Sequence, residues 1–205
     1  MPPATSRTAR AGYVIVSLMF FFVAAFGVFS LVSIAVGIAR DGTSLLWGDT
    51  LTVPMALNPD TLRLPAGLTL GGWPEVQVEI HDPTTEQMLL RSFMDIGPLV
   101  LFLAVLWSLR GLARSVKEGD PFSRLNVRRL RSIGFTLVVG APLIEIIQVS
   151  LREQLFNQLP STGADIGVSG FSLPGVALLA GLGTFILAEV FAHGVSLRED
   201  VEGTV

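Results

Sequence analysis

Long apolar runs separated by polar segments are the main pattern along the chain. The first run extends from Gly12 to Ala39 without a charged residue and is rich in Phe, and three more occupy residues 93–113, 132–156 and 174–195. About 20 predominantly apolar residues are enough for a helix to cross the ~30 Å hydrocarbon core of a bilayer. The pattern therefore predicts an all-α membrane protein built as a bundle of four transmembrane helices.

Two of these runs allow other interpretations. Arg7 and Arg10 precede the first run, as in a signal peptide, and Ala35-Val36-Gly37 loosely resembles a cleavage site. A signal peptide has an apolar core of about 7–15 residues, and this run is about twice as long, so we expect an uncleaved helix. The second run is short, but Trp107 and Arg110 at its end can anchor it at the membrane interface.

A different period appears between the first two runs. Residues 75–81 alternate strictly, with the apolar side chains at even positions, which is the pattern of a half-buried strand. Residues 50–53 begin a similar pattern, and Pro54 should restrict that strand to an edge or to a short length. Residues 62–64 and 68–70 are weaker candidates. We predict a small β-rich extracytoplasmic insert that packs on helix ends, either as a sensing or docking surface or, the interpretation we favour, as a structured connector.

Composition narrows the class of protein further. The mean hydropathy is +0.62 and only 15% of the 205 residues are charged, which excludes a cytosolic globular enzyme and a disordered chain. The absence of Cys excludes thiol nucleophiles, Cys-ligated zinc and iron–sulfur clusters. The net charge of -3 and the lack of a nucleic-acid motif argue against nucleic-acid partners. We therefore expect no cofactor.

The basic residues define an orientation. Ten of the 14 Lys and Arg residues fall on one side of the predicted membrane: Arg7, Arg10, Arg110, Arg114, Lys117, Arg124, Arg128, Arg129, Arg131 and Arg198. The positive-inside rule then places both termini in the cytoplasm. The predicted segments are the N-tail 1–11, the helices 12–39, 93–113, 132–156 and 174–195, the outer insert 40–92, the basic connection 114–131, the outer loop 157–173 and the C-tail 196–205.

The basic connection should contain a helix start. In Gly119-Asp120-Pro121-Phe122, Asp120 can cap free N–H groups and Pro121 suits the first helical position. The helix would continue from there through the third span to about Leu159.

Four arginines gather on the inner part of that helix. Arg124, Arg128 and Arg131 form one stripe, with Arg129 beside them. The stripe has three interpretations: topology control with contact to anionic headgroups of the bilayer, pairing with tail acids such as Glu199 and Asp200, or docking of a cytoplasmic regulatory protein.

Glu145 lies near the middle of the third span, with Gln148 on the same face. A carboxyl at that depth is a functional candidate by default, because burying it costs several kcal/mol. It binds a proton or cation, or it is hydrogen-bonded and fixes helix packing; we favour the second interpretation.

Glu189 and His193 stand four residues apart on the fourth span. This spacing favours a side-chain pair, which we expect to be structural; a pH-responsive pair and two ligands of a metal site are the alternatives. Small residues at positions 180, 184, 188 and 192 predict a close-packing stripe, within the chain or between copies in a homo-oligomer.

Two stretches resemble a known family. They are residues 119–134, beginning Gly-Asp-Pro-Phe, and residues 185–205, which contain Leu197-Arg198-Glu199-Asp200. Together they resemble a bacterial four-helix membrane family catalogued as domain of unknown function 2975. The resemblance implies a bacterial inner-membrane location and, because members are often found beside small helix-turn-helix regulators, a regulatory partner. It implies no catalytic residues.

We find no catalytic set, since the two His residues lie on opposite sides of the predicted membrane. We expect a non-enzymatic regulatory or interaction module with a cytoplasmic contact face. The alternative is a small proton- or cation-coupled transporter that uses Glu145.

Overall fold

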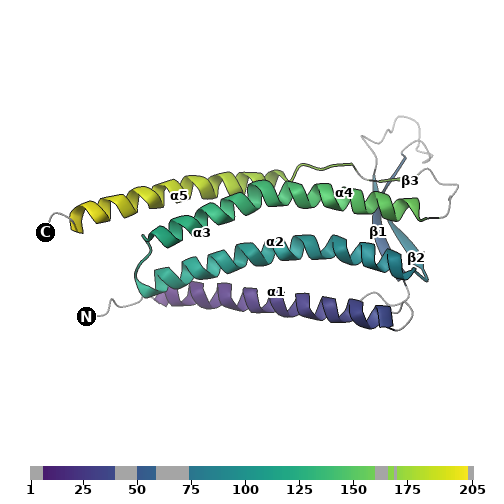
Figure 1. The fold of residues 1–205 in the computed structure, drawn as a ribbon, viewed down its shortest axis with the longest axis horizontal. Coiled ribbons are helices and arrows are strands. Elements are labelled where there is room, and N and C mark those ends of the chain that lie inside the picture. Colours follow the sequence, from purple (N-terminus) through teal and green to yellow (C-terminus); the bar gives the residue numbers. More distant parts are fainter. Residues whose placement is uncertain (1–6, 40–49, 59–73, 160–165, 169, 203–205) are drawn as a thin grey trace, which may run out of the picture. The chain divides into compact units, whose positions relative to one another are not determined.

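The computed structural model describes residues 7–39, 50–58, 74–159, 166–168 and 170–202. Its elements are α1 (Arg7–Ala39), β1 (Thr50–Leu57), β2 (Glu75–His81), α2 (Thr85–Glu118), α3 (Arg124–Phe135), the π-helical turn η2 (Thr136–Gly140), α4 (Ala141–Asn157), β3 (Ile166–Gly167) and α5 (Gly175–Glu202) (Figure 1). The weaker strand candidates at residues 62–64 and 68–70 lie outside the described residues.

Four helical segments are long and apolar enough to cross a membrane. They are Arg7–Gly37, Thr85–Glu118, Arg124–Asn157 and Gly175–Val201. The predicted fold class, four membrane helices with a small sheet, is confirmed. The chain divides into two compact units: unit 1 comprises Met1–Gly27, Pro98–Leu143 and Leu173–Val205, and unit 2 comprises Val28–Gly97 and Ile144–Ser172.

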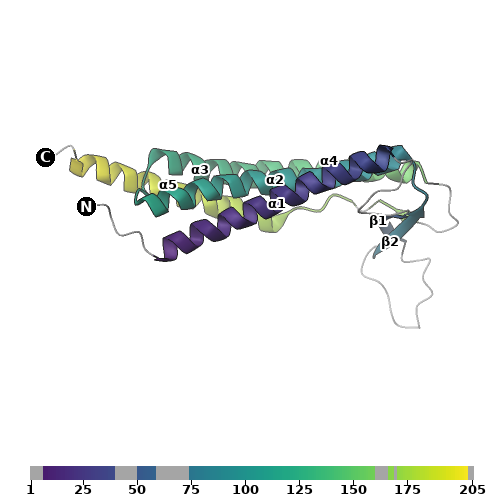
Figure 2. The same ribbon diagram turned by 90° about the horizontal axis from the view of Figure 1, so that it is seen from below.

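The sheet belongs to unit 2 and has the order β2-β1-β3. The pair β1 and β2 is antiparallel over seven residue pairs, Val53 opposite Val78 among them (Figure 2). Leu51, Val53 and Met55 point to one side and form a buried cluster with Leu155 of α4. The prediction that the insert packs on helix ends is confirmed, because alternation puts every second side chain on the face that the helix covers.

Two predictions about the strands are wrong. The strand that carries Pro54 is central in the sheet, not at its edge. It tolerates proline because β3 pairs only with Ala56 and Leu57, so the described part of the sheet leaves that side of β1 open at Pro54. The segment 157–173, predicted as loop, contributes β3.

The second span is longer at both ends than the apolar run 93–113. At its start Thr84 and Gln87 form a reciprocal capping box: the Thr84 N–H donates to Oε1 of Gln87 (3.0 Å), and the Gln87 N–H donates to Oγ1 of Thr84 (3.3 Å). The cap satisfies free N–H groups, so the helix begins at Thr85 among polar residues.

The expected helix start at Asp120 and Pro121 is also wrong. Gly119 ends α2 with a φ of 86°. The N–H of Gly119 donates to the Val116 carbonyl (3.2 Å) and that of Asp120 to the Ser115 carbonyl (3.1 Å), the two bonds of a Schellman motif. The next helix starts at Arg124, where Ser123 is the N-cap residue. The residues of the expected start are therefore a helix stop followed by a turn.

The third span is interrupted by η2, two residues before Pro142. Proline has no N–H, and its ring crowds the carbonyl four residues earlier. A turn with the wider π spacing relieves that crowding, so Pro142 explains the position of η2.

Unit 1 is held together where α3 crosses α5 (Figure 1). A Cβ on Gly181 would lie 3.0 Å from the carbonyl oxygen of Gly134, and one on Gly134 would lie 3.1 Å from that of Gly181. The buried residues of α5 are Gly181, Ala188 and Val195, seven apart. Of the predicted stripe at 180, 184, 188 and 192, Ala188 is buried and Ala180 is exposed, because the contact within the chain follows Gly181. Packing of the stripe between copies of the chain stays a prediction.

Candidate functional site

Three ion pairs join the C-terminal part of α5 to α3 and to the turn before it. Arg124 donates to both carboxylate oxygens of Glu199, from Nε at 2.9 Å and from Nη2 at 2.8 Å. A further pair joins Arg131 and Glu189 at 2.9 Å, and Arg198 contacts Asp120 at 2.6 Å. All six side chains are at least half exposed. We call these six residues, together with Arg128, the charged face.

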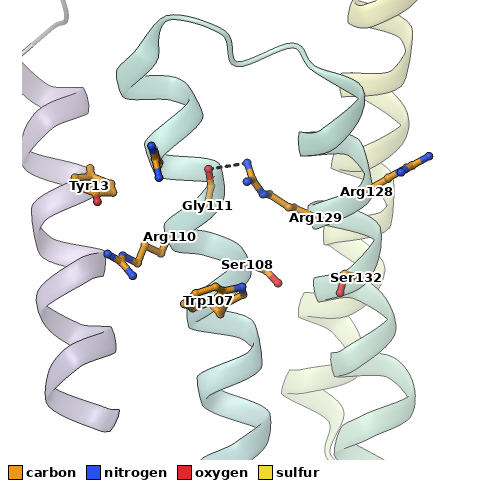
Figure 3. Close-up of a pocket in the computed structure, with 9 residues that line it drawn as sticks. Tyr13, Trp107, Ser108, Arg110, Gly111, Arg128, Arg129 and Ser132 are labelled. Atoms are coloured by element: carbon orange, nitrogen blue, oxygen red, sulfur yellow. Dashed lines mark hydrogen bonds between the residues drawn. The ribbon is translucent and has the colours of Figure 1, made fainter. Parts of the chain in front are cut away.

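Among the described residues, no acceptor or carboxylate engages Arg128, which also lies on α3. Its side chain points away from Gly111 and Arg129 in Figure 3. Asp200, predicted to belong to the contact surface, is also engaged in an interaction. The charged face thus combines internally paired groups with one guanidinium that has no partner in the described part of the chain.

Arg129 has a different role from its neighbours. Its Nη1 donates to the Gly111 carbonyl (2.8 Å) and to Oδ1 of Asn126 (2.9 Å). Asn126 is fully buried and donates from Nδ2 to Oγ of Ser115 (2.8 Å) and to the Pro121 carbonyl (2.9 Å). These bonds fix the connection between α2 and α3. Arg129, predicted to be a contact residue, therefore holds the turn on which the charged face stands.

A second basic site lies in unit 1, where α1, α2 and α3 come together. A cavity of about 430 Å³ is lined by Tyr13, Trp107, Ser108, Arg110, Gly111, Arg114, Arg128, Arg129 and Ser132 (Figure 3). Tyr13 and Arg110 face one another across α1 and α2 in that view. We refer to it as the arginine cavity.

Glu189 and His193 do not form the predicted side-chain pair. The Glu189 carboxylate accepts from Arg131, and Nδ1 of His193 lies 2.9 Å from the Glu189 backbone oxygen. The prediction failed because a guanidinium on the neighbouring helix competes for the carboxylate. No group of three or more His, Cys, Asp or Glu side chains that could hold a metal ion occurs among the residues described.

The polar residues of the third span belong to unit 2. Glu145 accepts a hydrogen bond from Nη2 of Arg152 at 2.9 Å, and both side chains are largely buried. Gln148 donates from Nε2 to the carbonyl of Met94 at 3.1 Å. Met94 is four residues before Pro98, which cannot supply the usual helical N–H, so Gln148 replaces a hydrogen bond that proline removed.

The structure therefore separates the predicted site residues into two groups. Arg124, Arg128, Arg129, Arg131, Glu189 and Glu199 lie in unit 1, while Glu145 and Gln148 lie in unit 2. Sequence reasoning missed Asn126, Asp120 as an ion-pair partner, and the arginine cavity. The sequence offered no signal for the cavity beyond the glycine at position 111, because only the structure shows that Arg129 packs against it.

The model of the family described as protein of unknown function (DUF2975) matches residues 75–205 of this chain. The chain belongs to the DUF2975 family. The matched region contains the charged face, and the resemblance found in residues 119–134 and 185–205 is confirmed. No curated protein and no solved structure matches this DUF2975 chain. Its four apolar helices suggest a multi-pass membrane protein.

Proposed function

We propose that this DUF2975 protein is a non-enzymatic regulatory or interaction module of the bacterial inner membrane, with both termini in the cytoplasm. A cytoplasmic protein would dock on the charged face. The observation that carries the proposal is the arrangement of Arg124, Arg128 and Glu199, in which a guanidinium that no described residue engages stands beside an exposed ion pair.

Exposed ion pairs suit exchange with a partner. Such pairs contribute little to folding, because water and salt screen them, so breaking one in favour of an intermolecular pair costs little. Arginine presents a planar fork that binds carboxylates through two bonds, as Arg124 does with Glu199. A partner with carboxylates at matching spacing would engage Arg128 first and then compete for its neighbours.

The distribution of charge supports the proposed orientation. The end of α2, helix α3, the start of α1 and the end of α5 carry ten of the 14 basic residues. The positive-inside rule assigns such segments to the cytoplasm. Attaching a reporter that is active only in the cytoplasm to either terminus tests this step separately from partner binding.

The docking proposal is tested by purifying the full chain from native membranes in mild detergent and identifying companions by mass spectrometry. The test variant is the charge swap Arg124→Glu with Glu199→Arg, combined with Arg128→Gln. The swap preserves the internal ion pair between positions 124 and 199. The positive charge removed from position 124 reappears at position 199, which lies on the same proposed side of the membrane. The control is Arg114→Gln, which removes one arginine that lies outside the charged face and pairs with Glu118.

A near-stoichiometric cytoplasmic companion that is lost in the swap and retained in the control would support the proposal. A companion that binds the swap as well as the wild type, or a chain that carries none, would refute it. Arg129 is left unchanged because its loss would disturb the turn between α2 and α3.

The alternative of a transporter that uses Glu145 receives no support from a specific observation. The carboxylate of Glu145 is already engaged by Arg152, and Gln148 satisfies a backbone carbonyl. These contacts favour a role of both residues in packing.

A further inference from the structure

The arginine cavity has the composition of an anion-binding site. Four of its lining residues are arginines and none is acidic. Arg114 is already paired with Glu118 at 2.8 Å. The side chain of Arg128 points away from Gly111 and Arg129 in Figure 3. Arg110 and Arg129 are the two other arginines of the lining, and in Figure 3 Arg110 points toward α1 while Arg129 reaches Gly111 from α3.

Arg129 offers donors that are already fixed in place. Its Nη1 makes two hydrogen bonds, whereas no described residue accepts from its Nε or Nη2. The guanidinium lies against Gly111, where an added Cβ would come within 2.6 Å of Nε. Because Gly111 and Asn126 immobilise the group, a ligand would not have to order it, which favours tight binding.

Arg110 supplies the second charge from the other side of α2. Its guanidinium lies 4.9 Å from the ring centre of Phe21, and its Nε donates to Oγ of Ser17 at 3.3 Å. The hydroxyl groups of Tyr13, Ser108 and Ser132 line the same cavity. The cavity lining therefore combines guanidinium and hydroxyl groups, which are donors that phosphate oxygens accept from.

The apolar neighbours of the cavity distinguish a lipid from a soluble phosphate. Phe20 packs on Trp107 with ring centres 5.5 Å apart. Trp107 is 63% exposed and Phe21 is 57% exposed, so an apolar surface continues directly from the arginines. A phospholipid could place its phosphate at the arginines and its acyl chains on the adjacent apolar surface. A free phosphate would cover only the arginines.

The positions of the lining residues relative to the apolar runs also favour a phospholipid. Tyr13 lies at the start of the first apolar run, and Trp107 and Arg110 lie at the end of the second. We propose that the arginine cavity binds the phosphate of an anionic phospholipid headgroup. Basic pockets between membrane helices are known to suit such headgroups. The inference requires membrane insertion but is independent of the docking of a protein partner.

The test uses Trp107 as a reporter in the full chain. The protein has three Trp residues, so Trp47→Phe with Trp73→Phe leaves Trp107 alone. The protein is reconstituted in phosphatidylcholine vesicles that contain brominated phosphatidylglycerol or, in the parallel sample, brominated phosphatidylcholine. Bromine quenches a nearby indole, so the ratio of the two quenching curves gives the relative association of the anionic lipid with the cavity.

We expect phosphatidylglycerol to be preferred and Arg110→Gln to lower the preference about fivefold, the factor that corresponds to about 1 kcal/mol for one arginine. Ser108→Asp places a carboxylate in the cavity and should lower it as much without removing an arginine. Arg131→Gln removes an arginine that does not line the cavity and should leave the preference within twofold.

Equal quenching by both lipids in the parent chain would overturn the proposal. An equal loss in Arg131→Gln and Arg110→Gln would also overturn it, because the preference would then arise from diffuse charge. Millimolar glycerol phosphate should leave the preference unchanged; if it abolishes the preference, the cavity takes a soluble phosphate ester and not a headgroup. Circular dichroism confirms that each variant retains its helix content.

Discussion

Two ion pairs with the same N–O distance, one in each unit, differ in how much of their side chains is exposed to solvent. Arg131 and Glu189 in unit 1 lie 2.9 Å apart with 53% and 60% of their side chains exposed. Arg152 and Glu145 in unit 2 are also 2.9 Å apart, but only 12% and 21% of their side chains are exposed. An exposed pair contributes little to stability, whereas removing one partner of a buried pair leaves an uncompensated charge.

The charged and polar side chains have different structural roles in the two units. In unit 2 Glu145 is paired with Arg152 and Gln148 donates to a backbone carbonyl, so these polar groups are part of the packing. In unit 1 the helices α3 and α5 are joined by small residues such as Gly134 and Gly181, and the ion pairs lie on the surface. Exposed ion pairs that contribute little to the fold of unit 1 are consistent with the docking that we propose.

The largest expected effect is at the buried pair. Arg152→Gln should destabilise the protein by about 3–5 kcal/mol, because Glu145 would keep a largely buried carboxylate without its cation. The loss is measured as a shift in reversible unfolding in mixed micelles at neutral pH.

The double variant Glu145→Gln with Arg152→Gln is the control for that experiment. It should recover most of the loss, because neither residue then carries an unpaired charge. If the double variant is as unstable as the sum of the two single variants, the pair is not coupled and the contrast between the units fails.

The second-largest effect is expected at the close contact of Gly181 on α5 with the third span, which joins these helices without charged groups. Gly181→Ala should cost about 1–3 kcal/mol, because its Cβ would lie 2.7 Å from Cγ2 of Val138 on the facing helix. Gly183→Ala is the matched control on the same helix, since nothing lies within 4 Å of its Cβ position. Unfolding should show the control to be neutral or slightly stabilised; equal losses would mean that the close contact does not hold α3 to α5.

A third prediction sharpens the role of Gln148. Gln148→Leu should cost about 1–3 kcal/mol, because the Met94 carbonyl would lose its donor. Pro98→Ala supplies a helical N–H for the same carbonyl, so it should stabilise the Gln148→Leu variant more than it stabilises the wild type. An equal effect of Pro98→Ala in both backgrounds would show that the two changes are independent.

Much of the fold could be predicted because it depends on local patterns. Apolar runs revealed the four helices, and the alternation in residues 75–81 matches β2 residue for residue. The errors fell where the outcome depends on contacts with distant residues. Gly119 and Asp120 serve the preceding helix and not the following one, and β1 is central because β3 returns from a segment more than 100 residues later.

The candidate sites were less predictable than the fold. Periodicity placed Arg124, Arg128 and Arg131 on one stripe, but it could not indicate that Arg124 and Arg131 find acids on α5. The same limit applies to Gln148, whose partner is a carbonyl exposed by a proline on another helix. Side chains at one depth in a helical bundle become neighbours through the crossing of helices, and that crossing depends on close contacts such as the one at Gly181.

The smallest effect is expected at the exposed pair of unit 1. Arg131→Gln should change the free energy of unfolding by less than about 1 kcal/mol, because both partners remain hydrated after the change. Measured beside Arg152→Gln in the same micelles, the ratio of the two losses expresses the difference between the units directly. A loss at Arg131 as large as that at Arg152 would mean that the charged face is structural. It would then be a poor docking surface, because a partner could engage Arg131 only by weakening the contact between α3 and α5.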